Sequence, residues 1–184
     1  GLLPAFILYA IFVLYPTIRV FTESLFKTGG LSGKKQFVGL NNFKTLFKDA
    51  QFIKAFQNTI FLIVIVTIVT MALAIFFAAV LSKEKIKGST FYRIVFYIPN
   101  ILSIAVVAAL FAVIYGMDDG LLNGLGRLFN PGTWVNTPFL GDKNLVVYSI
   151  AGAMIWQAIG YYMVMYMSTM SQIPEQLYEA ASLD

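Results

Sequence analysis

Residues 55–82 read AFQNTIFLIVIVTIVTMALAIFFAAVLS, a stretch of 28 residues without a charged side chain. As an α-helix it would be about 42 Å long, which exceeds the roughly 30 Å hydrocarbon core of a bilayer. Three further stretches also carry no charge, namely residues 1–18, 94–117 and 144–174. Because backbone polar groups must be satisfied inside lipid, four such stretches predict helices. The fold class that follows is an all-α membrane protein, a polytopic helical bundle.

The composition supports this class and disfavours others. Of the 184 residues, 59% are hydrophobic and 12% are charged, whereas a soluble domain is about 45–50% apolar and about 25% charged. The chain contains neither Cys nor His, which excludes disulfides, Cys/His zinc sites and Cys or His nucleophiles within it. A net charge of +4 spread over loops indicates membrane topology rather than nucleic-acid binding.

We predict four transmembrane helices, at about residues 2–21, 59–81, 94–115 and 145–169. The first could instead be a signal peptide, but Pro16 and Arg19 occupy the place where a small-residue cleavage site would be. Pro99 should kink or break the third helix, since proline removes a backbone donor. The chain begins without Met and ends within a sequence pattern, so we expect a fragment cut at both ends.

The loops leave the orientation open. Apolar residues recur at spacings of three and four over about 41–57, with lysines between them, which predicts an amphipathic helix at the interface or packed on the bundle. The loop at 22–58 holds six Lys or Arg, and the short loop at 82–93 holds four. These loops lie on opposite sides of the membrane, so the positive-inside rule gives a divided answer. The polar, turn-rich loop at 116–143 is interpreted as a connector.

The last three spans contain no deeply placed Asp, Glu, Lys or Arg, which weighs against a proton-coupled transporter. Their notable polar feature is a cluster of aromatic and amide side chains in the fourth span: Trp156, Gln157, Tyr161 and Tyr162. Aromatic faces combined with amide and hydroxyl groups suit a polyhydroxylated ligand, so these are candidate substrate-pathway residues. Packing is the alternative, because neutral polar groups also form hydrogen bonds between membrane helices.

The tail, residues 168–184, reads STMSQIPEQLYEAASLD. Pro174 suits the first turn of a helix, and Ile173, Leu177, Ala180 and Ala181 follow at helical spacing. We therefore expect a short amphipathic helix over about 174–184, directly after the fourth span. Its small residues would let a partner helix or groove approach closely, and a helix lying on the membrane surface is the alternative.

This tail resembles the EAA loop of ABC importer permeases. Glu179, Ala180, Ala181 and Asp184 match the form E-A-A-x-x-D-G-A of the sugar-uptake branch, whose Gly-Ala would come after the last residue. Residues 2–26, 37–62, 120–125 and 154–181 resemble successive parts of sugar-type permeases in the same order. The resemblance covers nearly the whole chain. It implies the helical, MetI-like permease fold, with six spans in this branch, of which four are visible here.

The resemblance also implies a function in sugar or oligosaccharide import. The tail would be the coupling helix, docking on a cytoplasmic ATPase subunit through Pro174, Leu177, Glu179, Ala180, Ala181 and Asp184. The implied partners are two ATPase subunits, a second permease subunit forming a heterodimer, an extracytoplasmic solute-binding protein and the lipid bilayer. The membrane would be the cytoplasmic (inner) membrane of a bacterium or archaeon. The chain has no G-x-x-x-x-G-K-[ST] loop, so ATP and Mg would be used by the partner and this chain would not be an enzyme.

Other functions remain open at this stage. Within the same family, the solute could be glycerol phosphate or another small polar molecule, although the visible spans lack the basic residue that a phosphate ester would favour. In another class, a four-span channel or scaffold protein would explain the apolar stretches but not the tail. An intramembrane enzyme would need catalytic acids, His or Cys near the membrane, and the spans contain none.

Overall fold

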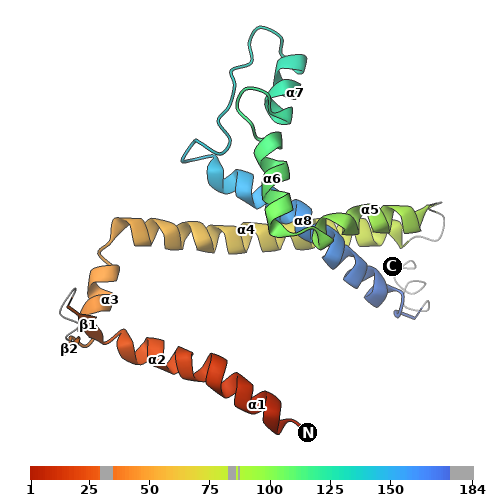
Figure 1. Ribbon diagram of the computed structural model, residues 1–184. Coiled ribbons are helices and arrows are strands. Elements are labelled where there is room, and N and C mark those ends of the chain that lie inside the picture. Colours follow the sequence, from red (N-terminus) through yellow and green to blue (C-terminus); the bar gives the residue numbers. More distant parts are fainter. Residues whose placement is uncertain (30–34, 83–85, 87, 175–184) are drawn as a thin grey trace, which may run out of the picture. The chain divides into compact units, whose positions relative to one another are not determined.

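The computed structural model covers residues 1–184 and describes all of them except 30–34, 83–85, 87 and 175–184. The chain forms two units, residues 1–57 and 58–184. The elements in chain order are α1 Leu3–Tyr9, the π-helix η1 Ala10–Leu14, α2 Tyr15–Glu23, β1 Phe26–Thr28, β2 Lys35–Phe37, α3 Asn41–Leu46, α4 Ala50–Leu81, α5 Ser89–Ile101, α6 Ile104–Ile114, α7 Leu121–Phe129 and α8 Val146–Met170 (Figure 1). The predicted all-α class is confirmed, since the described strands form only one small hairpin.

The first unit begins with one helical rod, Leu3–Glu23, which is long and apolar enough to cross a membrane. Its middle turn is a π-helix, in which the Tyr15 amide donates to the carbonyl of Ala10. Pro16 follows directly. A proline ring clashes with the carbonyl four residues before it, and a wider turn relieves that clash.

A hairpin and a short helix follow this rod. Strands β1 and β2 pair antiparallel, and the rings of Phe26 and Phe37 meet edge to face at 5.3 Å. Glu23 accepts from both Arg19 (3.1 Å) and Lys35 (2.8 Å), which ties the hairpin to the end of α2. The side-chain amide of Asn42 donates to the carbonyls of residues 24 and 26, and so holds α3 against the first strand.

The single amphipathic helix predicted over 41–57 is divided in the structure. Helix α3 ends at Leu46, and α4 begins at Ala50 and continues without interruption through the apolar stretch to Leu81. The break lies at Asp49, whose carboxylate accepts hydrogen bonds from the amides of Gln51 (2.8 Å) and Phe52 (3.3 Å). These two amides belong to the first turn of α4 and have no partner within the helix, so Asp49 is its N-cap.

The third predicted span, 94–115, is also not one straight helix. Helices α5 and α6 meet at an angle of 101°. The break comes at Leu102 and Ser103, both extended, just after Pro99 in the last turn of α5. The hydroxyl of Ser103 accepts from the amide of Val106 (3.4 Å) and caps α6. By length and composition the described helices include three that could cross a membrane, or four if the bent pair is one span.

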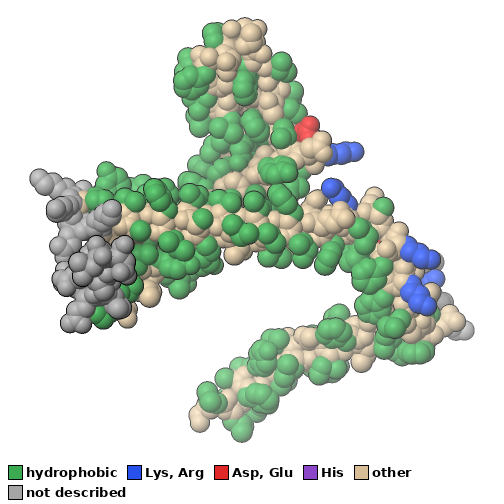
Figure 2. Space-filling model, turned by 180° about the vertical axis from the view of Figure 1, so that it is seen from behind, with side chains coloured by type: hydrophobic (Ala, Val, Ile, Leu, Met, Phe, Trp, Pro, Cys, Tyr) green, Lys and Arg blue, Asp and Glu red, His purple; other side chains and the backbone are tan. Residues whose placement is uncertain are grey.

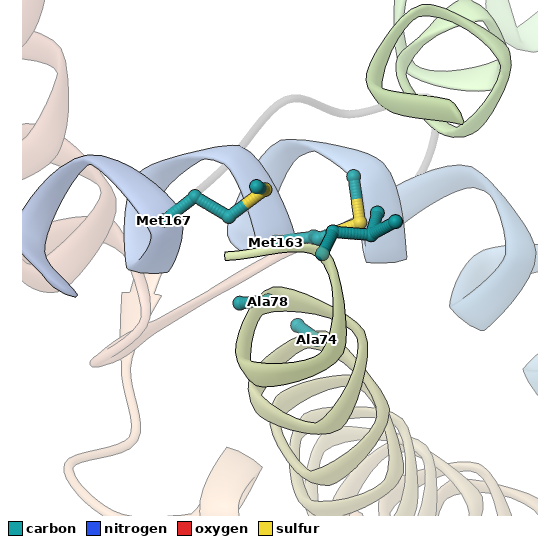
Figure 3. Close-up of a cluster of buried hydrophobic side chains, with 5 residues drawn as sticks. Ala74, Ala78, Met163 and Met167 are labelled. Atoms are coloured by element: carbon teal, nitrogen blue, oxygen red, sulfur yellow. The ribbon is translucent and has the colours of Figure 1, made fainter. Parts of the chain in front are cut away.

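The core of the second unit lies where α8 crosses α4 and α5. Ala74 and Ala78 of α4 are fully buried, and they face Met163 and Met167 of α8 (Figure 3). Residues four apart lie on one face of a helix, so the two alanines leave room for the long methionine side chains. Gly160 of α8 is buried against α5, where an added Cβ would collide with the backbone carbonyl of Phe96.

Much of the remaining surface of these helices is apolar (Figure 2). Along α4, Ile63 and Ile68 are 58% and 61% exposed, and Ile104 and Val113 of α6 are 80% and 70% exposed. A soluble protein rarely exposes continuous apolar surface of this extent. Such a surface is typical of helices that face lipid, so the chain is an integral membrane protein.

Candidate functional site

A cleft of about 290 Å³ lies between α6 and α8 in the second unit. Most of its lining is aliphatic or aromatic. The lining residues are Ile104, Val107, Ala108, Phe111, Ala112, Tyr115, Leu140, Ser149, Ile150, Ala153, Met154 and Gln157. Its volume is near the lower end of the range for small-molecule sites, which are also mostly apolar with a few polar groups.

The polar groups of the cleft come from three residues. Gln157 is half-buried, and its side-chain nitrogen donates to the carbonyl of Leu102 (3.3 Å) at the break between α5 and α6. The hydroxyl of Tyr115 donates to the carbonyl of Ser149 (2.9 Å), and the Ser149 hydroxyl donates to the carbonyl of Phe139 (2.9 Å). None of the described lining residues carries a charge. All three already form hydrogen bonds within the protein, so the open surface of the cleft is almost entirely apolar, with aromatic rings in its wall.

The four candidate substrate-pathway residues do not form one surface. Gln157 lines the cleft, and Trp156 lies next to it with its ring edge to face against Phe111 at 5.4 Å. Tyr161 and Tyr162 touch each other edge to face at 5.3 Å and lie one turn further along α8. Tyr162 packs against the Ala74–Met163 core, and Tyr161 is 41% exposed. The structure thus brings one of the four into the cleft.

Of the six candidate coupling residues, Pro174 is exposed and lies four residues after the end of α8 at Met170. The other five lie outside the described residues: Leu177, Glu179, Ala180, Ala181 and Asp184. Helix α8 runs for 25 residues from Val146 to Met170 without a break. One rigid element therefore links the cleft to the start of the tail.

Sequence reasoning missed a polar centre in the loop between α6 and α8. Asn123 on α7 is fully buried. Its amide nitrogen donates to the carbonyls of Gly116, Met117 and Thr137 at 3.0–3.1 Å. Its oxygen accepts from the Trp134 indole (3.1 Å) and from the Thr137 amide (2.9 Å). The available signal was one asparagine among the leucines and glycines of 120–126, which predicts a buried amide that must be fully paired.

Glycine is required beside this centre. A Cβ on Gly126 would collide with the ring of Trp134, and a Cβ on Gly120 would collide with the backbone of Gly116. The segment that the sequence suggested was a connector is therefore organised around a buried, hydrogen-bonded asparagine. In the described part of the chain, no group of three or more His, Cys, Asp or Glu side chains could hold a metal ion.

The chain matches known proteins over its whole length, although no protein-family model matches it. It is 35% identical over 184 residues to the probable ABC transporter permease protein YurN of Bacillus subtilis, covering 100% of this chain and 62% of that protein. It is 29% identical over 185 residues to the diacetylchitobiose uptake system permease protein NgcF of Streptomyces coelicolor, covering 96% of this chain and 52% of that protein.

A solved structure shows the same fold. The crystal structure of a bacterial ABC transporter involved in the import of the acidic polysaccharide alginate matches with a TM-score of 0.82 and 25% identity. The match covers 100% of this chain and 60% of that one. The chain thus spans between about half and three fifths of the length of these three proteins.

Proposed function

The chain is homologous over its whole length to the permease subunits of ABC transporters, and we propose that it forms part of the permease of an ATP-driven, binding-protein-dependent importer for sugars or oligosaccharides. The observation that carries the proposal is α8, which lines the cleft at one end and leads directly into the EAA-like tail at the other. A permease needs such a link, because the energy of ATP hydrolysis enters at the tail and the solute passes between the spans.

The uncharged lining of the cleft favours sugars over phosphate esters. Sugars present both hydroxyl groups and apolar ring faces. Gln157 supplies an amide, while Phe111 and Tyr115 supply aromatic surface. An anionic solute would gain from a basic side chain, and the described lining has none. The similarity to NgcF, the permease protein of a diacetylchitobiose uptake system, supports the same substrate class. Glycerol phosphate remains the second solute class within the family.

In the proposed mechanism, ATP binding closes two ATPase subunits and moves the tail helix as a lever. Glu179 would pair with polar or basic groups of the ATPase, Ala180 and Ala181 would permit close approach, and Asp184 would hold the turn. Helix α8 transmits this movement to α5 through Gly160 and to α4 through the Met163–Ala74 contact. Because α8 is continuous, a displacement at Met170 also shifts the wall of the cleft at Gln157.

The same proposal includes partners and location. The permease would pair with a second, different permease subunit and receive solute from an extracytoplasmic binding protein. ATP and Mg would be bound by the ATPase subunits and not by this chain, which is a transport component like its homologues. The tail would face the cytoplasm, in the cytoplasmic membrane of a bacterium or archaeon.

The first test uses the absence of cysteine from residues 1–184. Ala181→Cys is introduced into the full-length permease in native membranes, with any cysteine outside this segment replaced by serine. A thiol crosslinker should join residue 181 to an ATP-binding subunit, and the yield should change when ATP is added. Labelling of this cysteine only from outside the cell, or no crosslink to an ATPase, would exclude the importer function.

The second test separates coupling from folding. Ala181→Trp should abolish uptake of radiolabelled sugar and leave membrane insertion intact, because a large side chain prevents close approach of the ATPase. Ala181→Gly is the matched control and should retain uptake, since it keeps the surface small. Full uptake by the Trp variant would contradict the coupling role.

A further inference from the structure

A surface of lysine and phenylalanine side chains surrounds the junction of α3 and α4. Three lysines, Lys44, Lys48 and Lys54, are all exposed, and the single acidic residue within 41–57 is Asp49. The segment therefore carries a net charge of +2, from three lysines less one aspartate. In Figure 2, basic side chains gather near the start of α4, whereas most of α4 beyond is covered by hydrophobic ones.

These lysines have no carboxylate partner among the described residues. The ion pairs found there join Glu23 to Arg19 and to Lys35. The carboxylate of Asp49 caps α4 by accepting from two backbone amides. Its neighbour Lys48 is not among the ion pairs of the described residues. Three cationic groups thus remain available to an external anion.

The aromatic part of the surface continues into the lipid-facing side of α4. Phe52 lies between Phe47 and Phe56, with ring centroids 6.2 Å and 6.3 Å away. Phe47 and Phe56 are 66% and 56% exposed. Ile60 and Ile63 follow Phe56 at spacings of four and three, and they are 46% and 58% exposed. One apolar stripe therefore runs from the phenylalanines into the membrane span.

The length of α4 sets the depth of this surface. Lys54 and Leu81 lie 27 positions apart in one uninterrupted helix. At 1.5 Å per residue this distance is about 40 Å, close to the roughly 40–45 Å thickness of a bilayer with its headgroup regions. When Leu81 lies at one headgroup layer, Lys54 lies at the other. Lys44 and Lys48 precede it in the chain, at the same end of the span.

We propose that this lysine–phenylalanine surface binds anionic phospholipids, with Lys44, Lys48 and Lys54 contacting headgroup phosphates and Phe47 and Phe56 entering the boundary between headgroups and acyl chains. Ammonium groups and phosphates complement each other in charge, and apolar rings beside them are typical of interfacial helices. The bilayer is favoured over a protein partner because the aromatic stripe is continuous with the surface that already faces lipid. This inference is independent of the solute and of the ATPase.

The test measures which lipid surrounds the junction. Gln51 is exposed and lies between Lys48 and Lys54, so Gln51→Cys in the full-length permease, otherwise free of cysteine, receives a fluorophore. The protein is placed in phosphatidylcholine nanodiscs that contain a fixed fraction of nitroxide-labelled phosphatidylglycerol, or the same fraction of nitroxide-labelled phosphatidylcholine. Quenching by each labelled lipid gives its local enrichment.

With the native lysines, phosphatidylglycerol should be enriched over phosphatidylcholine by at least about fivefold, which is the effect of one basic residue near an anionic surface. The variant K44Q/K48Q/K54Q should reduce this ratio to near one, and K44R/K48R/K54R should retain it because the charge is kept. Salt at about 0.5 M should lower the ratio, since exposed charges are screened. Agreement of all these results supports the proposal.

The following results would overturn it. The first is a ratio of one with the native lysines, or a ratio that the glutamine variant does not change. The second is protection of the fluorophore by an added solute-binding protein, lost in the glutamine variant, in the absence of any preference for phosphatidylglycerol. The second result would assign the surface to a protein partner. Because the arginine variant keeps the positive charge, its loss of enrichment would also contradict the electrostatic basis.

Discussion

Replacing Asn123 should open the loop that joins α6 to α8. The side chain is fully buried and has five hydrogen-bond contacts: the two hydrogens of its nitrogen are shared among three carbonyls, and its oxygen accepts from two donors. Each such bond contributes roughly 0.5–1.5 kcal/mol net, and a buried group left without a partner costs more. Asn123→Ala removes all five at once, but water can replace some partners in a loop outside the membrane span. We therefore expect a loss of about 3–5 kcal/mol in local stability.

Two assays measure this loss. Hydrogen-exchange mass spectrometry in nanodiscs should show residues 116–137 exchanging at least roughly a hundredfold faster, since about 1.4 kcal/mol corresponds to a factor of ten. The chain has two tryptophans, so Trp156→Phe leaves Trp134 as the single tryptophan within residues 1–184, which can be excited selectively over tyrosine. Its indole donates to Asn123, and its emission should shift to longer wavelength when that bond is lost and water enters.

Asn144→Ala is the matched control, because Asn144 is exposed in the same loop, and among the described residues its backbone amide, but not its side chain, is hydrogen-bonded, to Asp142. It should leave both exchange and emission unchanged. If Asn123→Ala left the protection of 116–137 within fivefold of the parent, the loop would be held by its apolar contacts alone. The assignment of Asn123 as its organising centre would then be wrong.

Three further predictions concern helix packing and capping. Gly160→Ala should separate α5 from α8 and strongly lower the unfolding temperature in detergent, because the new Cβ meets backbone atoms. Gly152→Ala is the control: its Cβ meets only the end of a tyrosine side chain, so its effect should be mild. Equal effects of the two variants would contradict the close crossing of α5 and α8. Ala74→Leu should lower the free energy of unfolding by roughly 1–3 kcal/mol, because the larger side chain overpacks against α8. The measurement is the unfolding temperature. Ala79→Leu, on the exposed side of α4, should leave it nearly unchanged. Asp49→Ala should lower the free energy of unfolding by about 0.5–2 kcal/mol, because it removes the cap of α4. Amide hydrogen exchange in the first turn of α4 should become faster, whereas Asp49→Asn should retain most of the protection. Unchanged exchange in the alanine variant would refute the capping role.

The positions of breaks were harder to predict than the presence of helices. The apolar periodicity of 41–57 continues across Asp49, so the pattern predicted one helix where the structure has two. Aspartate before a helical stretch is a known start signal, and it could have placed the break. Pro99 predicted a disruption in the third span, but the chain turns at Leu102 and Ser103, where a serine caps the next helix.

The side chains of the candidate site illustrate a second limit. Trp156, Gln157, Tyr161 and Tyr162 are close in sequence and share a polar–aromatic character. On a helix, however, neighbouring positions point in different directions. Gln157 reaches the cleft, whereas Tyr162 packs into the core on another side of α8. Their proximity in sequence therefore did not place all four in one cleft.

By itself, the sequence determined that the chain is helical and lies in a membrane, because charge-free stretches of this length cannot be solvated and must satisfy their backbone within each helix. It also carried the resemblance to importer permeases through the residues of the tail. Only the tertiary structure decided that Gly160 lies against α5, that Ala74 faces Met163, and that Asn123 organises the loop. Hydropathy depends on each residue and its neighbours along the chain. Which faces meet depends instead on shape and hydrogen bonding between segments far apart in sequence.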